Sequence, residues 1–213
     1  MDLLMQANIS VGEQSPARTF AEAARRAQIV GVAIKVVATG GYPNASFARI
    51  AKEAGLSSTG IISYHFAGKD DLMREVIAEV MRAATEHLQP RIDAAVGARA
   101  KLRAYIHAHM SFLTAHPHHL RALVEVVGNL PRDTPERVEF IAQLDAIVGF
   151  HTDYIREGQA AGEFGQFDPR VMVIAIQGAI DAVVLRKLRE PGLDVERCGH
   201  ELADLFDRAT RPT

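Results

Sequence analysis

The sequence predicts an all-α fold, and three observations support this prediction. Apolar residues recur at the three- and four-residue spacing of a helix face through most of residues 17–209. No long stretch alternates apolar and polar residues with the period of two that a strand requires. Proline and glycine separate the periodic stretches, as they do at helix ends. We therefore expect an N-terminal three-helix domain followed by a C-terminal helical bundle.

The N-terminal region is expected to contain an arm and one long helix. Residues 1–16 lack periodicity and end in Ser15-Pro16, which indicates a mobile arm. An Ala-rich helix is expected over residues 17–39, where Gly40-Gly41 ends it. Pro43 disfavours helix at the residue before it, so the chain should turn at Tyr42-Pro43-Asn44.

The segment at residues 46–69, SFARIAKEAGLSSTGIISYHFAGK, carries two short helical patterns joined by a glycine. Ser46 can cap the first helix by accepting a backbone N–H. Gly55 stands where a helix can end in the left-handed conformation that glycine adopts at low cost. Two short helices around a sharp turn predict a helix-turn-helix, although the same pattern also occurs in ordinary bundles.

The second helix of this segment is expected to begin at a cap formed by Ser57 or Ser58 and to end at Ser63 or Tyr64. Its remaining side chains are small or form hydrogen bonds, which suits contacts with base edges and phosphates in a major groove. The candidate DNA-binding residues are Ser46, Ser57, Ser58, Thr59, Gly60, Ser63, Tyr64, His65 and Lys69.

The distribution of charge favours the same end of the chain. The whole protein has a net charge of −2, which does not by itself suggest nucleic acid. Residues 17–69 hold seven basic and two acidic side chains, a charge of +5, whereas the remainder has a charge of −7. A basic end on an acidic body can approach phosphates in one orientation only.

The run IAKEAGLSSTGIISYHFAGKDDL, residues 50–72, resembles the DNA-binding segment of the TetR family of bacterial transcriptional regulators. The likeness covers residues 25–77. There is one residue more than usual between Gly55 and Phe66, which leaves the register of Ser57 to Thr59 open, and Ser63 stands where the family often has tyrosine. The resemblance implies a DNA-binding domain at residues 17–70 and a ligand-binding and dimerisation domain at residues 71–213.

The helix expected at residues 69–87 leaves the DNA-reading segment directly and should end before Pro90, which makes it a candidate mechanical link. Five more helices are expected between breakers, at residues 99–115, 118–130, 135–159, 168–189 and 194–209.

The last two of these helices carry apolar stripes with small residues, which let helices approach closely. They can face either their own domain or a second copy, and the family resemblance implies a homodimer. The candidate interface residues are Val171, Ile174, Gly178, Ala182, Leu185, Leu202, Leu205 and Phe206.

Polar side chains on otherwise apolar faces suggest a small-molecule pocket in the C-terminal bundle. Each could instead be a satisfied core or interface residue. The candidate ligand-binding residues are Tyr105, His109, Phe112, Glu125, Asn129, Phe140, Leu144, His151, Tyr154, Gln177 and Asp181.

The sequence gives little support for nucleotide binding, metal binding or catalysis. Nucleotide-binding glycine loops are absent, and a single cysteine, Cys198, excludes an internal disulfide. His107, His109, His116, His118 and His119 cluster within thirteen residues. His107 and His109 should point to different faces, Pro117 breaks the helix between His116 and His118, and no cysteine accompanies them, so we expect no metal site. We also expect no cofactor and no enzyme activity. Neither a signal peptide nor a membrane span is evident, which favours the cytoplasm.

The sequence is thus interpreted as a ligand-responsive repressor that binds a palindromic DNA operator as a homodimer and is released by a small-molecule effector. The alternative is an α-helical bundle enzyme or binding module without a DNA role. Neither the effector nor the operator can be identified from the sequence.

Overall fold

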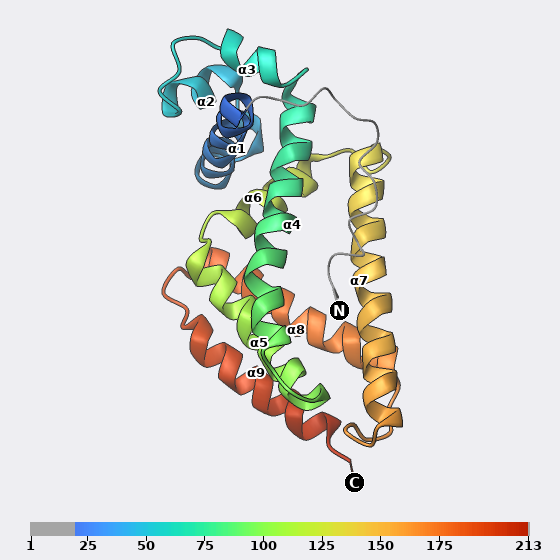
Figure 1. Cartoon of the computed structure of the whole chain (residues 1–213). Coiled ribbons are helices and arrows are strands. Elements are labelled where there is room, and N and C mark those ends of the chain that lie inside the picture. Colours follow the sequence, from blue (N-terminus) through green and yellow to red (C-terminus); the bar gives the residue numbers. More distant parts are fainter. Residues whose placement is uncertain (1–19, 213) are drawn as a thin grey trace. The chain divides into compact units, whose positions relative to one another are not determined.

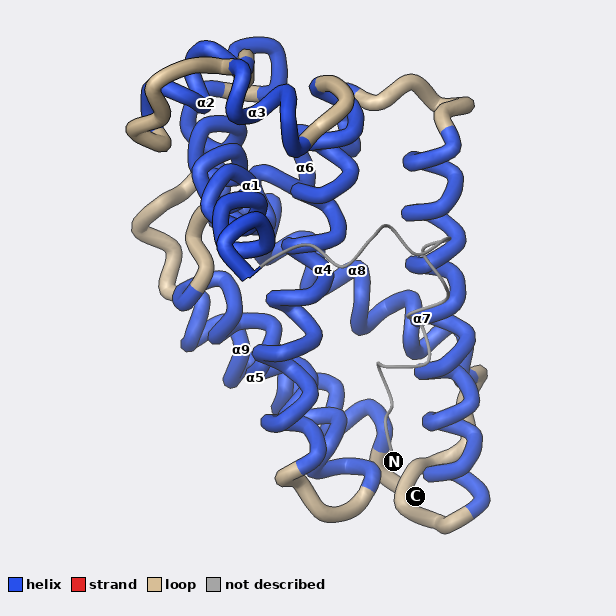
Figure 2. Tube along the Cα trace, turned by 45° about the horizontal axis from the view of Figure 1, so that its top comes forward, coloured by secondary structure: helices blue, strands red, loops and turns tan. Residues whose placement is uncertain are grey.

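The computed structural model describes residues 20–212, and every regular element in this range is helical (Figure 2). The all-α prediction is confirmed. The mobile arm predicted for residues 1–16 lies outside the described residues. The elements are α1 (Phe20–Gly40), the short 3-10 helix η2 (Tyr42–Asn44), α2 (Phe47–Glu53), α3 (Gly60–His65), α4 (Lys69–Asp93), α5 (Ala98–Ala115), α6 (His119–Asn129), α7 (Pro135–Ala160), α8 (Pro169–Arg189) and α9 (Val195–Thr210).

The chain divides into two compact units. Among the described residues, the N-terminal unit comprises 20–83 and 117–137, which hold α1 to α3, most of α4 and α6. The C-terminal unit comprises 84–116 and 138–212, which hold the end of α4, α5, most of α7, α8 and α9. The division falls inside α4. The functional boundary expected near residue 70 stays a prediction.

In the N-terminal unit, α1 packs against α2 and α6, and the three short elements η2, α2 and α3 follow one another around its end (Figure 1). Ile29, Val37, Ile50 and Ile62 are fully buried and join these helices in one small core. Burial of a side chain of this size stabilises the fold by about 1.5–3 kcal/mol.

The predicted start and end of α2 are confirmed. Ser46 is its N-cap, and the Ser46 hydroxyl oxygen accepts the backbone N–H of Arg49 at 3.3 Å. Gly55 has φ +66°, in the left-handed region. The N–H of Gly55 bonds to the carbonyl of Lys52, and that of Leu56 to the carbonyl of Ala51, which is the Schellman arrangement. The sharp turn of the helix-turn-helix follows from this glycine.

The predicted start of α3 is wrong. The helix begins at Gly60 and its N-cap is Thr59, whose side chain makes no capping bond, so neither Ser57 nor Ser58 caps it. After the left-handed Gly55 the chain continues through an irregular stretch to Thr59, and it becomes helical only where Ile62 can enter the core. Packing decides this boundary, whereas capping preference alone predicted it too early.

The predicted end of α4 before Pro90 is also wrong, because the helix includes Pro90 and ends at Asp93. A proline inside a helix removes one backbone hydrogen bond, but the last turn stays helical here because Leu88 and Ile92 are buried. The helix closes with Ala94 N–H bonded to the carbonyl of Pro90 at 3.2 Å, and the Arg91 side chain donates to the carbonyl of His87. The other C-terminal helices begin and end within one or two residues of their predicted bounds.

In the C-terminal unit, α5 and α9 lie side by side (Figure 1). Gly199 of α9 allows this approach, since a Cβ at that position would lie 2.8 Å from Cγ of Met110. The Asp207 carboxylate receives Arg99 of α5 at 2.7 Å and Arg211 at 2.8 Å. None of the described helices combines the length and the apolar character needed to cross a membrane.

Candidate functional site

The turn before α3 and the outer side of α3 are exposed. Six of the predicted DNA-binding residues lie there with accessible side chains or backbone: Ser57, Ser58, Thr59, Gly60, Ser63 and Tyr64. The Tyr64 ring is 74% exposed, and its hydroxyl donates to Glu22 of α1 at 3.0 Å. Ile62 faces the core, so α3 presents a polar outer side and an apolar inner side.

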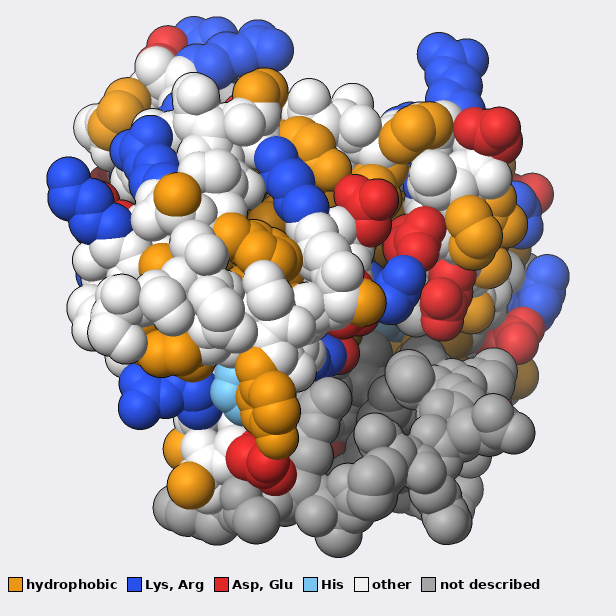
Figure 3. Space-filling view, turned by 90° about the horizontal axis from the view of Figure 1, so that it is seen from above, with side chains coloured by type: hydrophobic (Ala, Val, Ile, Leu, Met, Phe, Trp, Pro, Cys, Tyr) orange, Lys and Arg blue, Asp and Glu red, His pale blue; other side chains and the backbone are white. Residues whose placement is uncertain are grey.

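Basic side chains surround this exposed surface. In the view from above, Lys and Arg side chains are spread over the part of the surface that α1 to α3 form, and Asp and Glu are sparse there (Figure 3). Arg25, Arg49 and Lys52 are among the exposed residues of these helices. A polar helix face bordered by cations is suited to a phosphate backbone.

The other three predicted DNA-binding residues are placed differently. Ser46 is exposed but its oxygen caps α2. His65 is buried, with 9% of its surface exposed. The Lys69 ammonium donates to the carbonyl of Tyr42 at 2.7 Å and lies 4.1 Å from the centre of the Tyr42 ring. Partial burial lowers the pKa of Lys69. Lys69 therefore fastens the start of α4 to η2.

Arg26 of α1 holds α3 in place, a role that the sequence analysis missed. Its guanidinium donates to the carbonyl of His65 at 2.6 Å, pairs with Glu75 of α4 at 2.5 Å and stacks 4.2 Å from the centre of the Phe66 ring. One side chain thus joins the end of α3 to α1 and α4. Its basic charge was noted in the sequence, but these partners lie 39 to 49 residues away and only the fold reveals them.

Two residues predicted to bind a ligand lie in the N-terminal unit instead. The Glu125 carboxylate of α6 accepts the backbone N–H of Tyr42 at 3.4 Å, and the Asn129 amide donates to the carbonyl of Glu125. Both therefore serve the packing of α6 in this unit.

A cavity in the C-terminal unit lies among α4, α5, α7 and α8. Its empty volume is about 800 Å³, including its open mouth, and its wall is mostly apolar. The lining side chains are Leu88, Gln89, Ile92, Lys101, Leu102, Tyr105, Ile147, Phe150, His151, Tyr154, Ile155, Val173, Ile176 and Gln177.

Four of the predicted ligand-binding residues line this cavity: Tyr105, His151, Tyr154 and Gln177. The other seven do not, namely His109, Phe112, Glu125, Asn129, Phe140, Leu144 and Asp181. His109 and Asp181 touch the wall from outside, because His109 packs 4.3 Å from the Tyr105 ring and Asp181 accepts the Gln177 amide at 3.0 Å. The apolar lining from α4 was not among the predicted residues.

Both tyrosine hydroxyls of the cavity wall are hydrogen-bonded. The Tyr105 hydroxyl donates to Oε1 of Gln177 at 2.9 Å, and the Tyr154 hydroxyl donates to the carbonyl of Ala98 at 2.9 Å. Loss of solvation lowers the pKa of His109 to about 4 and that of His151 to about 4. Both imidazoles are therefore neutral at pH 7, and the inner wall carries no histidine charge.

These two histidines predict a loss of stability in mild acid. Their folded pKa lies below the unfolded value of about 6.5, so the unfolded state binds more protons between pH 6.5 and 4. Stability is full above pH 6.5, and it falls by about 2 kcal/mol per histidine at pH 5. Urea unfolding of the wild type and His151→Gln at pH 7 and pH 5 measures this. Equal losses in the two proteins would contradict it.

The outer side of α8 carries the predicted interface stripe. Val171, Ile174, Gly178, Ala182 and Leu185 are all exposed, and a Cβ at Gly178 would meet no atom within 4 Å. On α9, Leu205 is 50% exposed, Leu202 is partly exposed and Phe206 is buried. The exposed members form an apolar surface of the kind that marks interaction sites. Phe206 belongs to the core of its own unit.

No group of three or more His, Cys, Asp or Glu side chains within residues 20–212 is placed to hold a metal ion. The clustered histidines are dispersed: His107 pairs with His200 at 4.7 Å between ring centres, whereas His116 stacks on Phe112 at 4.6 Å.

Two related proteins share sequence with this chain over different lengths. It is 29% identical over 158 residues to the fatty acid metabolism regulator protein of Bacillus subtilis. The aligned region covers 74% of this chain and 80% of that relative. It is 36% identical over 87 residues to the HTH-type transcriptional regulator BetI of Burkholderia ambifaria. That match covers 39% of this chain and 43% of BetI, so the chain spans less than half of the BetI length.

Two solved structures share the fold. FadR from Bacillus subtilis, in complex with stearoyl-CoA, has a TM-score of 0.71 at 22% identity, covering 84% of this chain and 96% of FadR. A regulator from Saccharomonospora viridis, in complex with choline, has a TM-score of 0.77 at 22% identity, covering 88% of this chain and 98% of that regulator.

Two family models match separate parts of the chain. Residues 29–76, which include the helix-turn-helix, match the model described as bacterial regulatory proteins, tetR family. Residues 95–185, which include much of the cavity wall, match the tetracyclin repressor-like C-terminal domain. The chain therefore belongs to the TetR family of bacterial transcriptional regulators.

Proposed function

We propose that this regulator is a homodimeric repressor that binds a palindromic operator and is released by a small apolar effector. The observation that carries the proposal is the extent of α4. Lys69 at its start contacts η2 beside the helix-turn-helix, and Leu88, Gln89 and Ile92 near its end line the cavity. A ligand that prefers one arrangement of the cavity wall can bias the helix that leads to the DNA-reading segment.

The proposed DNA contacts are on the exposed side of the helix-turn-helix. Thr59, Ser63 and Tyr64 would face base edges. Ser46 and Lys69, which cap α2 and hold α4 to η2, would position the helix-turn-helix on the phosphates. The buried His65 would position α3 rather than touch DNA, together with Arg26.

The proposed dimer would bury the exposed stripe of α8 with the exposed part of α9. Val171, Ile174 and Leu185 are 63%, 53% and 44% exposed in one copy, which is unusual for apolar side chains along one helix face. A second copy would cover them symmetrically, and two reading heads related by a two-fold axis require a palindromic site.

A ligand-responsive function has support from the relatives. The Bacillus subtilis relative is a regulator of fatty acid metabolism, and two structures with this fold contain stearoyl-CoA or choline.

The rival function, a helical enzyme or binding module without a DNA role, would show no steep salt dependence of DNA retention. Neutralised phosphates release counterions, so operator affinity should fall steeply with salt.

Tyr64→Ala is expected to weaken operator binding by roughly 5- to 150-fold while leaving the fold intact, because the ring is exposed and a base contact contributes about 1–3 kcal/mol. The operator fragment is first recovered by genomic footprinting, and affinity is then measured by fluorescence anisotropy. Val96→Ala is the control, since Val96 is 91% exposed and lies in the C-terminal unit. A Tyr64→Ala variant that binds as tightly as the control would show that α3 does not read DNA.

A further inference from the structure

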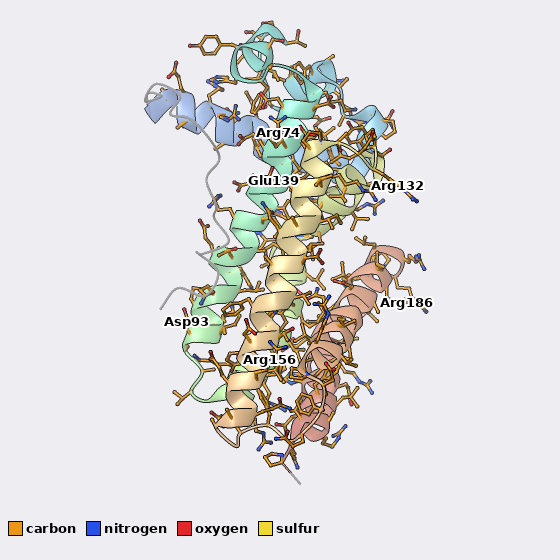
Figure 4. The ribbon with its side chains drawn as sticks, turned by 90° about the vertical axis from the view of Figure 1, so that its right-hand side faces the viewer. Arg74, Asp93, Arg132, Glu139, Arg156 and Arg186 are labelled. Atoms are coloured by element: carbon orange, nitrogen blue, oxygen red, sulfur yellow. The ribbon has the colours of Figure 1, made fainter. Side chains whose placement is uncertain are left out.

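Two glutamines of the cavity wall are each held by an aspartate one helical turn later. On α4 the Gln89 amide nitrogen donates to Asp93 at 2.8 Å, and on α8 the Gln177 amide nitrogen donates to Asp181 at 3.0 Å. Asp93 and Asp181 are exposed, and Asp93 lies at the outer edge of the last turns of α4 (Figure 4). A carboxylate only accepts hydrogen bonds, so each pairing fixes the amide nitrogen outward and the amide oxygen on the other side.

The two amide oxygens then differ in their partners. Oε1 of Gln177 accepts the Tyr105 hydroxyl, which commits the only proton of that hydroxyl. Oε1 of Gln89 is buried and has no hydrogen-bond partner. A buried acceptor without a donor costs about as much as a lost hydrogen bond. Gln89 lines the cavity, so a bound molecule that displaces neighbouring side chains of the wall can reach Oε1 while the nitrogen keeps Asp93.

Apart from Lys101, the polar atoms of the cavity wall therefore offer more acceptors than donors. Both Oε1 of Gln89 and the lone pairs of the Tyr105 hydroxyl accept, whereas the neutral His151 ring has one donor and one acceptor nitrogen. A hydroxyl group can give its proton to an acceptor and receive one from His151. The remaining wall is apolar and aromatic, with Phe150 and Tyr154 beside His151 on α7.

Charged ligands fit this wall less well. The loss of solvation that lowers the pKa of His109 and His151 would also disfavour a cationic ligand. The same loss of solvation raises the pKa of the Tyr105 hydroxyl, so it would disfavour an anionic ligand as well. Lys101 lines the cavity, but it also lines an adjoining depression together with Glu157 and Glu163. The negative charge of these carboxylates would compete with an anionic ligand for Lys101.

We propose that the effector is a neutral apolar molecule with a hydroxyl group, which donates a hydrogen bond to Oε1 of Gln89. The regulatory role of this ligand rests on the proposed function, but its binding to the cavity can be tested without DNA. Two other ligand classes are thereby rejected: a carboxylic acid held by Lys101, and a quaternary ammonium held by the aromatic side chains.

The test is calorimetric titration of the full-length protein with four straight-chain probes: octanol, octyl methyl ether, octanoate and octyltrimethylammonium. Octanol is expected to bind about 3- to 10-fold more tightly than the ether, since the net effect of one hydrogen bond is of this size. Gln89→Leu removes the acceptor at similar volume and should make octanol and the ether equal. Gln166→Leu, an exposed glutamine outside the cavity, should keep the difference.

Tighter binding of octanoate or octyltrimethylammonium than of octanol would overturn the proposal, as would no binding of any probe or an unchanged preference in Gln89→Leu. These results are distinct from failure of the proposed function. If octanol binds with the expected preference but leaves operator affinity unchanged, the ligand class stands and the regulatory role of the cavity falls.

Discussion

Gly178→Arg is expected to convert the protein from a dimer to a monomer and to weaken operator binding by at least about 100-fold. In one copy a side chain at this position meets nothing within 4 Å, so the substitution should leave the fold of the protomer intact. In the proposed dimer it would place a long charged side chain in the middle of an apolar interface. Loss of the second reading head removes the gain from bivalent docking, which is commonly 10²- to 10⁴-fold.

The matched control for this substitution is Gly128→Arg. Gly128 is also an exposed helical glycine with no atom within 4 Å of its Cβ position, but it lies on α6 of the N-terminal unit. Light scattering and operator titration should show a dimer with near wild-type affinity for the control and a monomer for Gly178→Arg. A Gly178→Arg protein that remains dimeric would place the interface elsewhere.

Octanol, the probe for the proposed hydroxyl-bearing effector, is expected to weaken operator binding by roughly 5- to 150-fold at saturation. A ligand can shift DNA affinity only by its own preference between two arrangements of the protein, and such preferences are commonly about 1–3 kcal/mol. Small displacements of α4 would disturb simultaneous docking of two heads in successive grooves. Gln89→Leu should need more octanol for the same effect, and Gln166→Leu should match the wild type.

The parts of the fold that follow local rules could be predicted from the sequence. The cap of α2 by Ser46 and the turn at Gly55 depend on neighbouring residues only, and both are present. The start of α3 could not be predicted in this way. Ser57 is a good cap by preference, but the chain first has to complete a turn that places Ile62 in the core.

Residues of the candidate sites could be predicted where their placement depends on neighbouring residues, and not where it depends on packing against distant parts of the chain. Exposed α3 residues such as Ser63 and Tyr64 follow from helix periodicity. Glu125 and His109 have the composition of pocket residues, yet Glu125 faces η2 and His109 backs the Tyr105 ring. The role of Arg26 depends on partners more than thirty residues away, so spacing along the chain carries no signal for it.

The reciprocal coupling between octanol and the operator tests the central claim most directly, because it requires both sites and a connection between them. Calorimetry with octanol is performed on the dimer alone and on the dimer saturated with the footprinted operator. Linkage requires that the operator weaken octanol binding by the same factor by which octanol weakens operator binding, within roughly 5- to 150-fold. Equal octanol affinities in the two titrations would show that the cavity does not regulate the DNA-reading segment.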